Sequence, residues 1–458
     1  MIKIFRITKG KKFLIFLSLL IILTIISGGI HFYFNYDPKK EFTIDKQAKI
    51  NPNKKYKIVY WDYPLLWGES GDYKTFLQDK IDIFQKTYPN IEIEYKLLSP
   101  LEGEIKLKQR LEAGTPPDIY NSIFAEKRFN SKLQIPISLL ISDEDLKKYH
   151  PAAIESFSKE NKIWGLPQWL FPQVWVANES ILKKADLDLT TIYQHGWNWD
   201  LFRKTAQDLS SVEHKKHIIF HPYNEKLLFQ LLAANKGAKI ISEKKEFNKE
   251  RIIESFELLA ELREDTVFPA PEEKMGKKLL PYFWQGKAGI IAPVTPWLLN
   301  SIYQQHKRYS NINLTLLPVP VSDNTQRKFL VETTGLLLFR QQEYQGDDHS
   351  KAVYKFAQFI NQKQNLYLSK KLKVLPAYLP SYSNWKREVK LNNKIKDLLL
   401  NYAQSEDDIN SLSIQNGSLI PEIKDILGTE YQKFWLNDLS TVELVNEIEE
   451  KIAREEKH

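Results

Sequence analysis

The feature that most constrains the fold is an alternation of short apolar segments and amphipathic segments in residues 58–120. Apolar residues recur three and four positions apart in the longer segments, which predicts helices, and the shorter segments have the apolar pattern of strands. In chain order we expect a strand at 58–61, a helix at 74–87, a strand at 91–98, a helix at 102–112 and a strand at 118–120. Strands joined by helices pair in parallel through right-handed crossovers, so this pattern predicts an α/β fold with a parallel sheet.

The same alternation resumes after Gly165 and continues towards the C-terminus. Strands are expected at 173–178, 217–223, 287–293, 314–321 and 329–339. Helices are expected at 198–210, 248–265, 350–362, 394–404 and 441–457. The chain has 458 residues, of which 43% are hydrophobic, so it can bury the core of two or three domains.

The sequence contains no cysteine. This excludes disulfides, cysteine-ligated zinc, iron–sulfur clusters, a cysteine nucleophile and the lipid-bearing cysteine of a bacterial lipoprotein. His214 and His217 are spaced like metal ligands, but the two lysines between them favour a solvated turn. We therefore expect neither a metal site nor a cofactor.

The net charge of +8 is concentrated at the N-terminus. The first twelve residues contribute +5 and the other 446 residues contribute +3. A nearly balanced surface produces no general field that would follow a phosphate backbone. We therefore expect no nucleic-acid partner.

Residues 13–30 form an uncharged apolar run, and aromatic residues extend it to Phe34. Its length is close to the roughly 20 residues that cross a bilayer. The basic flank predicts that residues 1–12 stay in the cytoplasm and that the chain after Phe34 is extracytoplasmic. The alternative is a cleaved signal peptide with Ser27-Gly28-Gly29 as its small residues. We expect an uncleaved anchor at 13–34, followed by a polar tether at 35–55.

Six segments in this order resemble one known family, the extracellular solute-binding proteins of ABC importers, in the sugar-binding branch related to maltose-binding protein. The segments are FQKTYPNIEIEY (84–95), LEAGTPPDIY (111–120), NKIWGLPQWLFPQVWVANESILKKADL (161–187), GWNWDLFRKTAQDL (196–209), FWQGKAGIIAPVTPWL (283–298) and LLPVPV (316–321). The resemblance extends over about residues 56–458. Three departures concern the missing lipobox cysteine, Val176-Ala177-Asn178 in place of the family's "YN", and Thr334-Gly335 in place of its "GG".

The resemblance implies a two-lobed periplasmic-binding-protein fold of type II, with a ligand cleft between the lobes and the transmembrane helix before them. One lobe would comprise residues 56–162 and 312–385, and the other residues 163–311 and 386–458. It further implies a monomer without enzymatic activity that binds a carbohydrate, closes about a hinge and delivers the ligand to the membrane subunits of an ABC permease.

Sugar rings stack on aromatic side chains, and their hydroxyls bind carboxylates and amides, so we expect the ligand site on loops at strand ends. The candidate residues are Trp61, Asp62, Trp67, Glu69, Asn121, Ser122, Trp169, Phe171, His221, Tyr223, Trp297, Glu332 and Trp435. Asn121 or Ser122 could instead cap a helix, and Trp435 could pack in a helical core. Trp164 and Trp175 lie in strand-like sequence and are expected in the core.

Three other functions stay open at this point. Trp61-Asp62 with Trp67 and Glu69 could form an aromatic cage for a polyamine, and a phosphorylated polyol is a further small polar solute. A secreted glycan-active enzyme would have a similar aromatic cleft, although no G-x-S-x-G, H-E-x-x-H or phosphate-loop motif is present. A sensor subunit would bind a ligand without transporting it.

Overall fold

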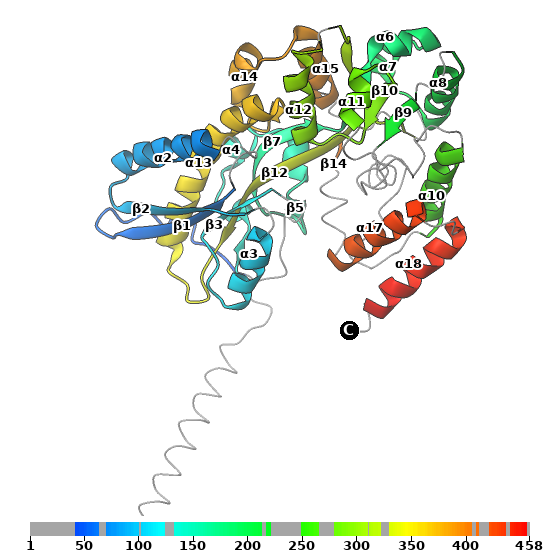
Figure 1. Cartoon of the computed structure of the whole chain (residues 1–458). Coiled ribbons are helices and arrows are strands. Elements are labelled where there is room, and N and C mark those ends of the chain that lie inside the picture. Colours follow the sequence, from blue (N-terminus) through cyan, green and yellow to red (C-terminus); the bar gives the residue numbers. More distant parts are fainter. Residues whose placement is uncertain are drawn as a thin grey trace, which may run out of the picture. The chain divides into compact units, whose positions relative to one another are not determined.

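The computed structural model describes residues 42–63, 70–99, 102–123, 132–212, 217–220, 249–264, 279–309, 311–321, 329–404, 409–411, 421–436 and 440–455. The chain divides into two compact units, Met1–Ile44 and Asp45–His458 (Figure 1). The second contains a larger sheet, a smaller sheet and a two-stranded sheet of β5 (Ser158–Lys159) and β6 (Lys162–Ile163). The predicted membrane span at 13–34 lies outside the described residues. Within the described ranges, no helix combines the length and the apolar character needed to cross a bilayer.

The larger sheet has eight strands. In chain order they are β1 (Tyr56–Asp62), β2 (Ile91–Leu97), β3 (Ile119–Ser122), β4 (Gln134–Ile135), β7 (Leu166–Pro172), β12 (Phe329–Phe339), β13 (Leu375–Pro376) and β14 (Ile409–Ser411). The main path runs β13-β7-β12-β3-β1-β2, and β4 and β14 pair with β12. As predicted, β1 pairs in parallel with β2 and β3, whereas β12 runs antiparallel to both β3 and β7.

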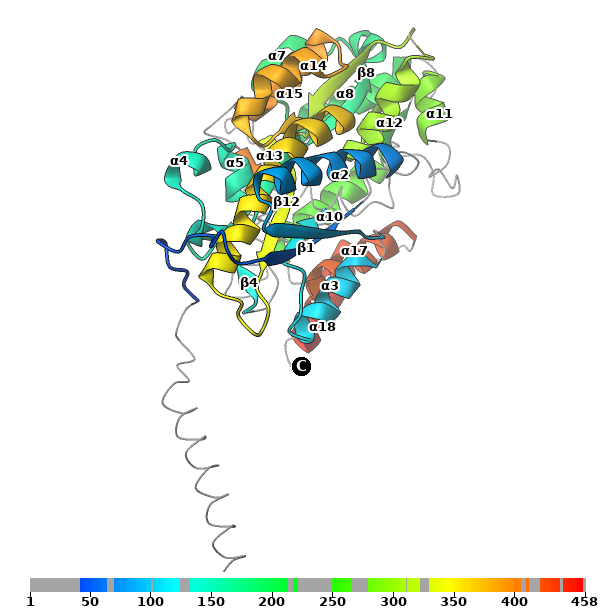
Figure 2. The ribbon, with the colours of Figure 1, turned by 90° about the vertical axis from the view of Figure 1, so that its left-hand side faces the viewer.

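Helices cover both faces of the larger sheet. The helices α2 (Ser70–Thr87) and α13 (Asp347–Leu372) lie on one face, and α3 (Gly103–Glu112) lies on the other (Figure 2). Side chains alternate between the faces along each strand. Trp61 and Tyr120 therefore join an apolar cluster on the α3 side, whereas Asp62 reaches Tyr73 of α2 on the other side.

The smaller sheet has four strands in the order β11-β8-β10-β9. Their bounds are β8 (Val174–Asn178), β9 (His217–Phe220), β10 (Ala288–Ala292) and β11 (Leu314–Pro318). The helices that follow or pack around it are α6 (Glu179–Leu182), α7 (Leu189–His195), α8 (Trp199–Val212), α10 (Lys249–Glu264), α11 (Leu279–Trp284), α12 (Pro296–His306), α17 (Pro421–Leu436) and α18 (Thr441–Glu455). Its core includes Trp175, which is fully buried as predicted. The centroid of the Trp175 ring lies 5.2 Å from that of the Phe202 ring.

The chain changes sheet at Gln173, because β7 ends at Pro172 in the larger sheet and β8 begins at Val174 in the smaller one. It returns between β11 and β12. Two further helices, α14 (Tyr382–Glu388) and α15 (Asn393–Gln404), follow β13. The predicted lobe boundaries at 163 and 312 remain a prediction, whereas these sheet memberships are direct observations.

Most predicted strands and helices occur within a few residues of their expected bounds, but β7 was not predicted. A strand containing Pro167 is unusual, because proline donates no hydrogen bond to the ladder. The pairing of β7 with β12 shifts register between Thr334 and Gly335, where Pro167 faces Gly335. This irregularity accommodates the proline within a strand whose seven residues are all buried.

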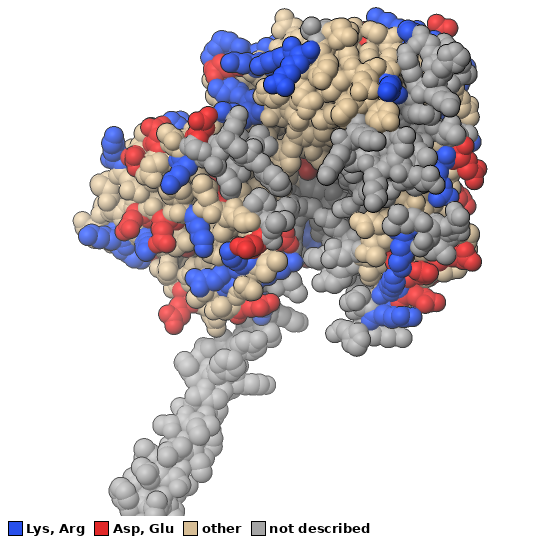
Figure 3. All heavy atoms as spheres, viewed as in Figure 1, with Lys and Arg blue, Asp and Glu red and all other residues tan. Residues whose placement is uncertain are grey.

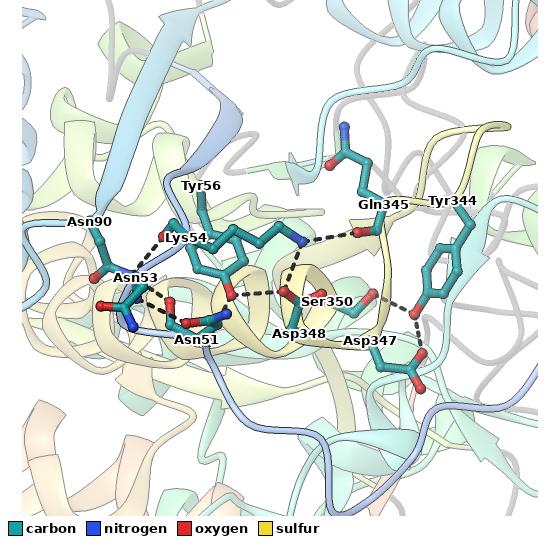
Figure 4. A network of polar contacts seen from close by, with 10 residues as sticks. All are labelled: Asn51, Asn53, Lys54, Tyr56, Asn90, Tyr344, Gln345, Asp347, Asp348 and Ser350. Carbon is teal, nitrogen blue, oxygen red and sulfur yellow. Dashed lines mark hydrogen bonds and ion pairs between the residues drawn. The ribbon is translucent and has the colours of Figure 1, made fainter.

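Residues 45–55, part of the predicted tether, are bonded to the body of the protein. Lys54 Nζ lies 2.7 Å from a carboxylate oxygen of Asp348, and the Tyr56 hydroxyl donates to the same oxygen at 2.8 Å (Figure 4). The Asp45 amide donates to Asp347 at 2.9 Å. Because Asp347 and Asp348 form the first turn of α13, the segment is fixed at the N-terminal end of that helix.

Gly335 provides a test of the close approach between β7 and β12. A Cβ at this position would lie 2.4 Å from the Leu166 carbonyl oxygen and 2.6 Å from Phe157 Cζ. We expect Gly335→Ala to lower the free energy of unfolding by about 1–3 kcal/mol, measured by urea denaturation.

Gly289 in β10 is the matched control, because its added Cβ would meet no backbone atom and would come no closer than 3.3 Å to a side chain, that of Ile181. Gly289→Ala should change stability much less. Equal losses in the two variants would show that the contact with Leu166 is not the limiting one.

Candidate functional site

Seven predicted site residues lie on neighbouring strands of the larger sheet: Trp61, Asp62, Asn121, Ser122, Trp169, Phe171 and Glu332. Asp62 ends β1 and Ser122 ends β3, at the carboxyl edge that the parallel pairing creates. Further along the sheet, Glu332 of β12 lies opposite Phe171 of β7, and Trp169 lies opposite Thr334. Side chains that are directly opposite each other share one face of a sheet, so this pairing places Glu332 on the face of Phe171.

Asp62 is fully buried in a network of hydrogen bonds. Its carboxylate accepts from the hydroxyls of Tyr60 at 2.5 Å and Tyr73 at 2.6 Å, and from the side-chain amides of Asn121 at 2.6 Å and Gln364 at 3.0 Å. These donors come from β1, α2, β3 and α13, so the carboxylate joins four elements. Asn121 Oδ1 is buried without a hydrogen-bond partner among the described residues.

Burial raises the pKa of the Asp62 carboxyl, and the hydrogen bonds from Tyr60, Tyr73 and Asn121 oppose that rise without cancelling it. Burial, followed by the negative charge of Asp62, raises the pKa values of both tyrosines well above their usual range. The network therefore favours forms with little net charge. The Asp62 carboxylate is therefore a structural group that joins the strand ends, and it is not presented to solvent.

Trp297 and Trp169 form an aromatic contact between elements of the two sheets. Trp297 lies in the first turn of α12, which begins at Pro296 and which Thr295 caps by accepting from the Leu298 amide at 3.1 Å. Its ring is edge-on to that of Trp169, with centroids 6.2 Å apart and an interplanar angle of 72°. Trp297 is 42% exposed and Trp169 is 3% exposed. The exposed ring is therefore held in place by a buried one.

Polar groups lie on the strands beside this aromatic pair. Gln173, which separates β7 from β8, donates from Nε2 to Glu332 Oε2 at 2.9 Å. Phe171 is completely buried, so it supports the site without presenting its ring. Trp297 and Glu332 therefore supply an aromatic face and a carboxylate, and Gln173, which is 2% exposed, holds that carboxylate by its hydrogen bond.

Two predicted tryptophans lie elsewhere. Trp435 is 5% exposed and packs against Tyr431 and Phe434 in the core beside the smaller sheet. Trp61 lines a hollow of about 730 Å³ on the α3 side of the larger sheet, and Lys96 Nζ lies 5.7 Å from its ring centroid. Neither ring lies with Trp169 and Trp297. Trp67, Glu69, His221 and Tyr223 lie outside the described residues.

Gln173 was not among the predicted site residues, although a glutamine between Pro172 and Val174 in an apolar run is a usable signal. Gln168 and Thr334 were missed in the same way, and they are hydrogen-bonded to each other inside the sheet at 3.3 Å.

No group of three or more histidine, aspartate or glutamate side chains in the described part of the chain could hold a metal ion. In Figure 3, basic and acidic side chains are interspersed over the described surface.

Asp62 gives a pH-dependent prediction. A carboxyl whose pKa is higher in the folded state contributes stability that is present at low pH and is lost as the pH rises through the folded pKa. The stability of the wild type relative to Asp62→Asn should therefore fall as the pH rises above the ordinary aspartate value of 3.8, measured by urea denaturation at several pH values.

Asp188 is the control of opposite sign, because hydrogen bonds from Thr191 and Thr190 lower the pKa of its carboxyl. The stability of the wild type relative to Asp188→Asn should instead rise with pH below 3.8 and become constant above it, because the folded-state pKa of this carboxyl lies below the ordinary value. A rise with pH for the Asp62 pair as well would contradict the buried, proton-retaining carboxyl.

Solved structures of solute-binding proteins share this fold. An ABC substrate-binding protein from Listeria monocytogenes, in complex with cycloalternan, has a TM-score of 0.65 and 17% identity, covering 88% of this chain and 100% of that chain. The GacH receptor of Streptomyces glaucescens, solved unliganded and with acarbose, has a TM-score of 0.61 and 16% identity, covering 87% and 98%. A family 1 extracellular solute-binding protein from Bifidobacterium longum subsp. infantis has a TM-score of 0.67 and 18% identity, covering 88% and 100%.

A comparison with curated protein sequences finds no match. The model of one protein family, the bacterial extracellular solute-binding proteins, matches residues 67–365, which is more than half of the chain. Those residues include β7, β12 and the aromatic pair, and the resemblance predicted from the six sequence segments is thereby confirmed. The chain belongs to the bacterial extracellular solute-binding protein family.

Proposed function

We propose that this protein is the carbohydrate-binding component of an ABC import system, and that the exposed ring of Trp297 beside Trp169 is the centre of its ligand site. The C–H face of a sugar ring packs well on an indole, whose orientation is here fixed by a buried neighbour. The Glu332 carboxylate, which is oriented by the hydrogen bond from Gln173, supplies acceptors for hydroxyl groups. A site with these groups favours an uncharged, hydroxyl-rich ligand.

The position of these residues suggests how binding changes the conformation. Trp297 belongs to α12, which lies between strands β10 and β11 of the smaller sheet in the chain, whereas Glu332 belongs to the larger sheet. Gln173 is the residue at which the chain passes from the larger sheet to the smaller one. A ligand that contacts both sides stabilises the form in which they are close, and the free protein exchanges between open and closed forms. The closed form is then the one that binds the permease, with residues 13–34 as the membrane anchor.

The ligands of the structural neighbours support a carbohydrate. The Listeria protein was solved with cycloalternan and the Streptomyces receptor with acarbose. Since identity to both is below 20%, they support the ligand class and leave the particular sugar open. An affinity near micromolar, which corresponds to about −8 kcal/mol, is within reach of stacking plus a few hydrogen bonds.

The polyamine alternative is disfavoured by the surroundings of Trp61. A cation would need an open aromatic face with carboxylates nearby. The Trp61 ring is only 8% exposed and already lies beside the Lys96 ammonium, while Asp62 is fully buried on the opposite face. We therefore keep the uncharged carbohydrate as the proposed ligand.

The ligand class can be tested by a thermal-shift screen of the soluble protein, residues 35–458. The screen would contain mono- and oligosaccharides, polyamines and glycerol phosphates. We expect a carbohydrate to raise the unfolding temperature, because a ligand that binds only the folded state stabilises it. A rise with polyamines alone, or hydrolysis of an oligosaccharide by the protein, would overturn the proposal.

Trp297→Ala tests the proposed centre of the site. We expect it to weaken carbohydrate binding by about 2–4 kcal/mol, measured by titration calorimetry, because buried aromatic contacts dominate such sites. The protein should still fold, since 42% of the Trp297 surface is exposed and its loss removes one ring contact, that with Trp169.

Tyr309 is the matched control, because it is 40% exposed and stacks on another largely buried tryptophan, Trp284, at 4.9 Å. Tyr309→Ala should leave binding unchanged. If the two variants bind equally well, Trp297 is not part of the ligand site.

A further inference from the structure

The turn that ends α13 is fixed against the strand that carries Trp169. Lys373 adopts the left-handed conformation with φ 58°, and its amide donates to the Ser369 carbonyl, which closes the helix. Two residues later β13 begins, and its Pro376 lies opposite Trp169 of β7. The position of Lys373 is therefore set by the larger sheet.

The side chain of Lys373 contacts helix α12, which carries Trp297. Its Nζ donates to Asn300 Oδ1 and lies 6.0 Å from the centroid of the Tyr303 ring. Asn300 and Tyr303 both belong to α12, the helix whose first turn carries Trp297. An ammonium that is largely removed from water gains from both an amide acceptor and an aromatic face.

These contacts give α12 two attachment points on the larger sheet. The first is Trp297 on Trp169, and the second is the pair Asn300 and Tyr303 on Lys373. At 1.5 Å per residue, Trp297 and Tyr303 are about 9 Å apart along the helix axis. Two points this far apart restrict both the translation and the tilt of the helix.

Lysine is an unfavourable choice at this position for two reasons. A left-handed residue after a helix is usually glycine or asparagine, which adopt that conformation at lower cost. Lys373 is also only 8% exposed, and burial of an ammonium is costly unless it is paired. A residue that is unfavourable on both counts is best explained by the contact its side chain makes.

We propose that Lys373 is a positioning residue that holds α12 against the larger sheet and so presents Trp297 to the ligand. The role in binding rests on the proposed carbohydrate function, whereas the role in holding α12 does not. Lys373 acts through Asn300 and Tyr303. Loss of its ammonium should remove the second of these two contacts and leave the Trp297–Trp169 contact in place.

The holding role can be measured without any ligand. Because the chain has no cysteine, spin labels can be placed at two introduced cysteines, Ile105→Cys in α3 and Val442→Cys in α18, whose native side chains are 58% and 51% exposed. Double electron–electron resonance spectroscopy then gives the distribution of distances between the two spin labels. We expect a broader distribution in Lys373→Met than in the parent, and a narrow one again in Lys373→Arg, which keeps a cationic donor.

Two further variants make this result specific. Asn300→Leu should broaden the distribution like Lys373→Met, and the double variant should broaden it no further, because both remove the same contact. Lys370→Met is the matched control, since Lys370 lies at the same end of α13 but pairs with Glu388 at 2.7 Å. An unchanged distribution in both Lys373→Met and Asn300→Leu would overturn the holding role, whatever ligand the protein binds. If Lys373→Met does not fold, Asn300→Leu alone decides.

The binding role has its own readout. In the parent protein, Lys373→Met should weaken carbohydrate binding by about tenfold, as expected for a lost hydrogen bond from a charged group. In a Trp297→Ala background the same change should have almost no effect, because the residue being positioned is gone. Equal weakening in both backgrounds would show that Lys373 does not act through Trp297.

Discussion

The structure depends on the hydrogen bonds that α13 donates to the crossing strand β7. Asn361 Nδ2 donates to the carbonyls of Leu166 and Pro167 at 3.1 and 3.0 Å, and Asn365 Nδ2 donates to the Pro167 carbonyl at 3.1 Å. Gln364 accepts from Gln168 at 2.8 Å, and all three α13 side chains are fully buried. A proline-containing strand with an interrupted ladder needs partners of this kind, because unpaired buried carbonyls are costly.

The same helix determines the position of most of the proposed site. In its middle, Gln364 links β7 to the Asp62 network at the end of β1. At its C-terminal end, the turn at Lys373 leads into β13 beside Trp169 and contacts α12. Helix α13 thus positions β7 with its buried Trp169, and it also positions α12, the helix that carries Trp297.

The sequence predicted the regular part of this arrangement well, because apolar periodicity reflects which face of a segment is buried. The strand at 58–61 and the helix at 74–87 appear as β1 and α2. The polar face of α13 could not be predicted, since Asn361, Gln364 and Asn365 look like solvent-exposed residues until β7 is placed against them. Trp169 was predicted from its place between two prolines, and Trp297 from its place after a strand in a segment that resembles the family. Only the structure shows that these two rings touch and that Trp435 lies in a different core.

The most direct test of the central role of α13 is hydrogen–deuterium exchange of β7 amides in Asn361→Ala and Asn365→Ala. In the wild type, the free energy of opening that permits exchange should be as high for residues 166–171 as for β12, because α13 and β12 both hold β7. Each variant should expose β7 to faster exchange while the smaller-sheet strands β8 and β10 keep their protection. If β7 keeps its full protection in both variants, the amides of α13 are not what holds the crossing strand.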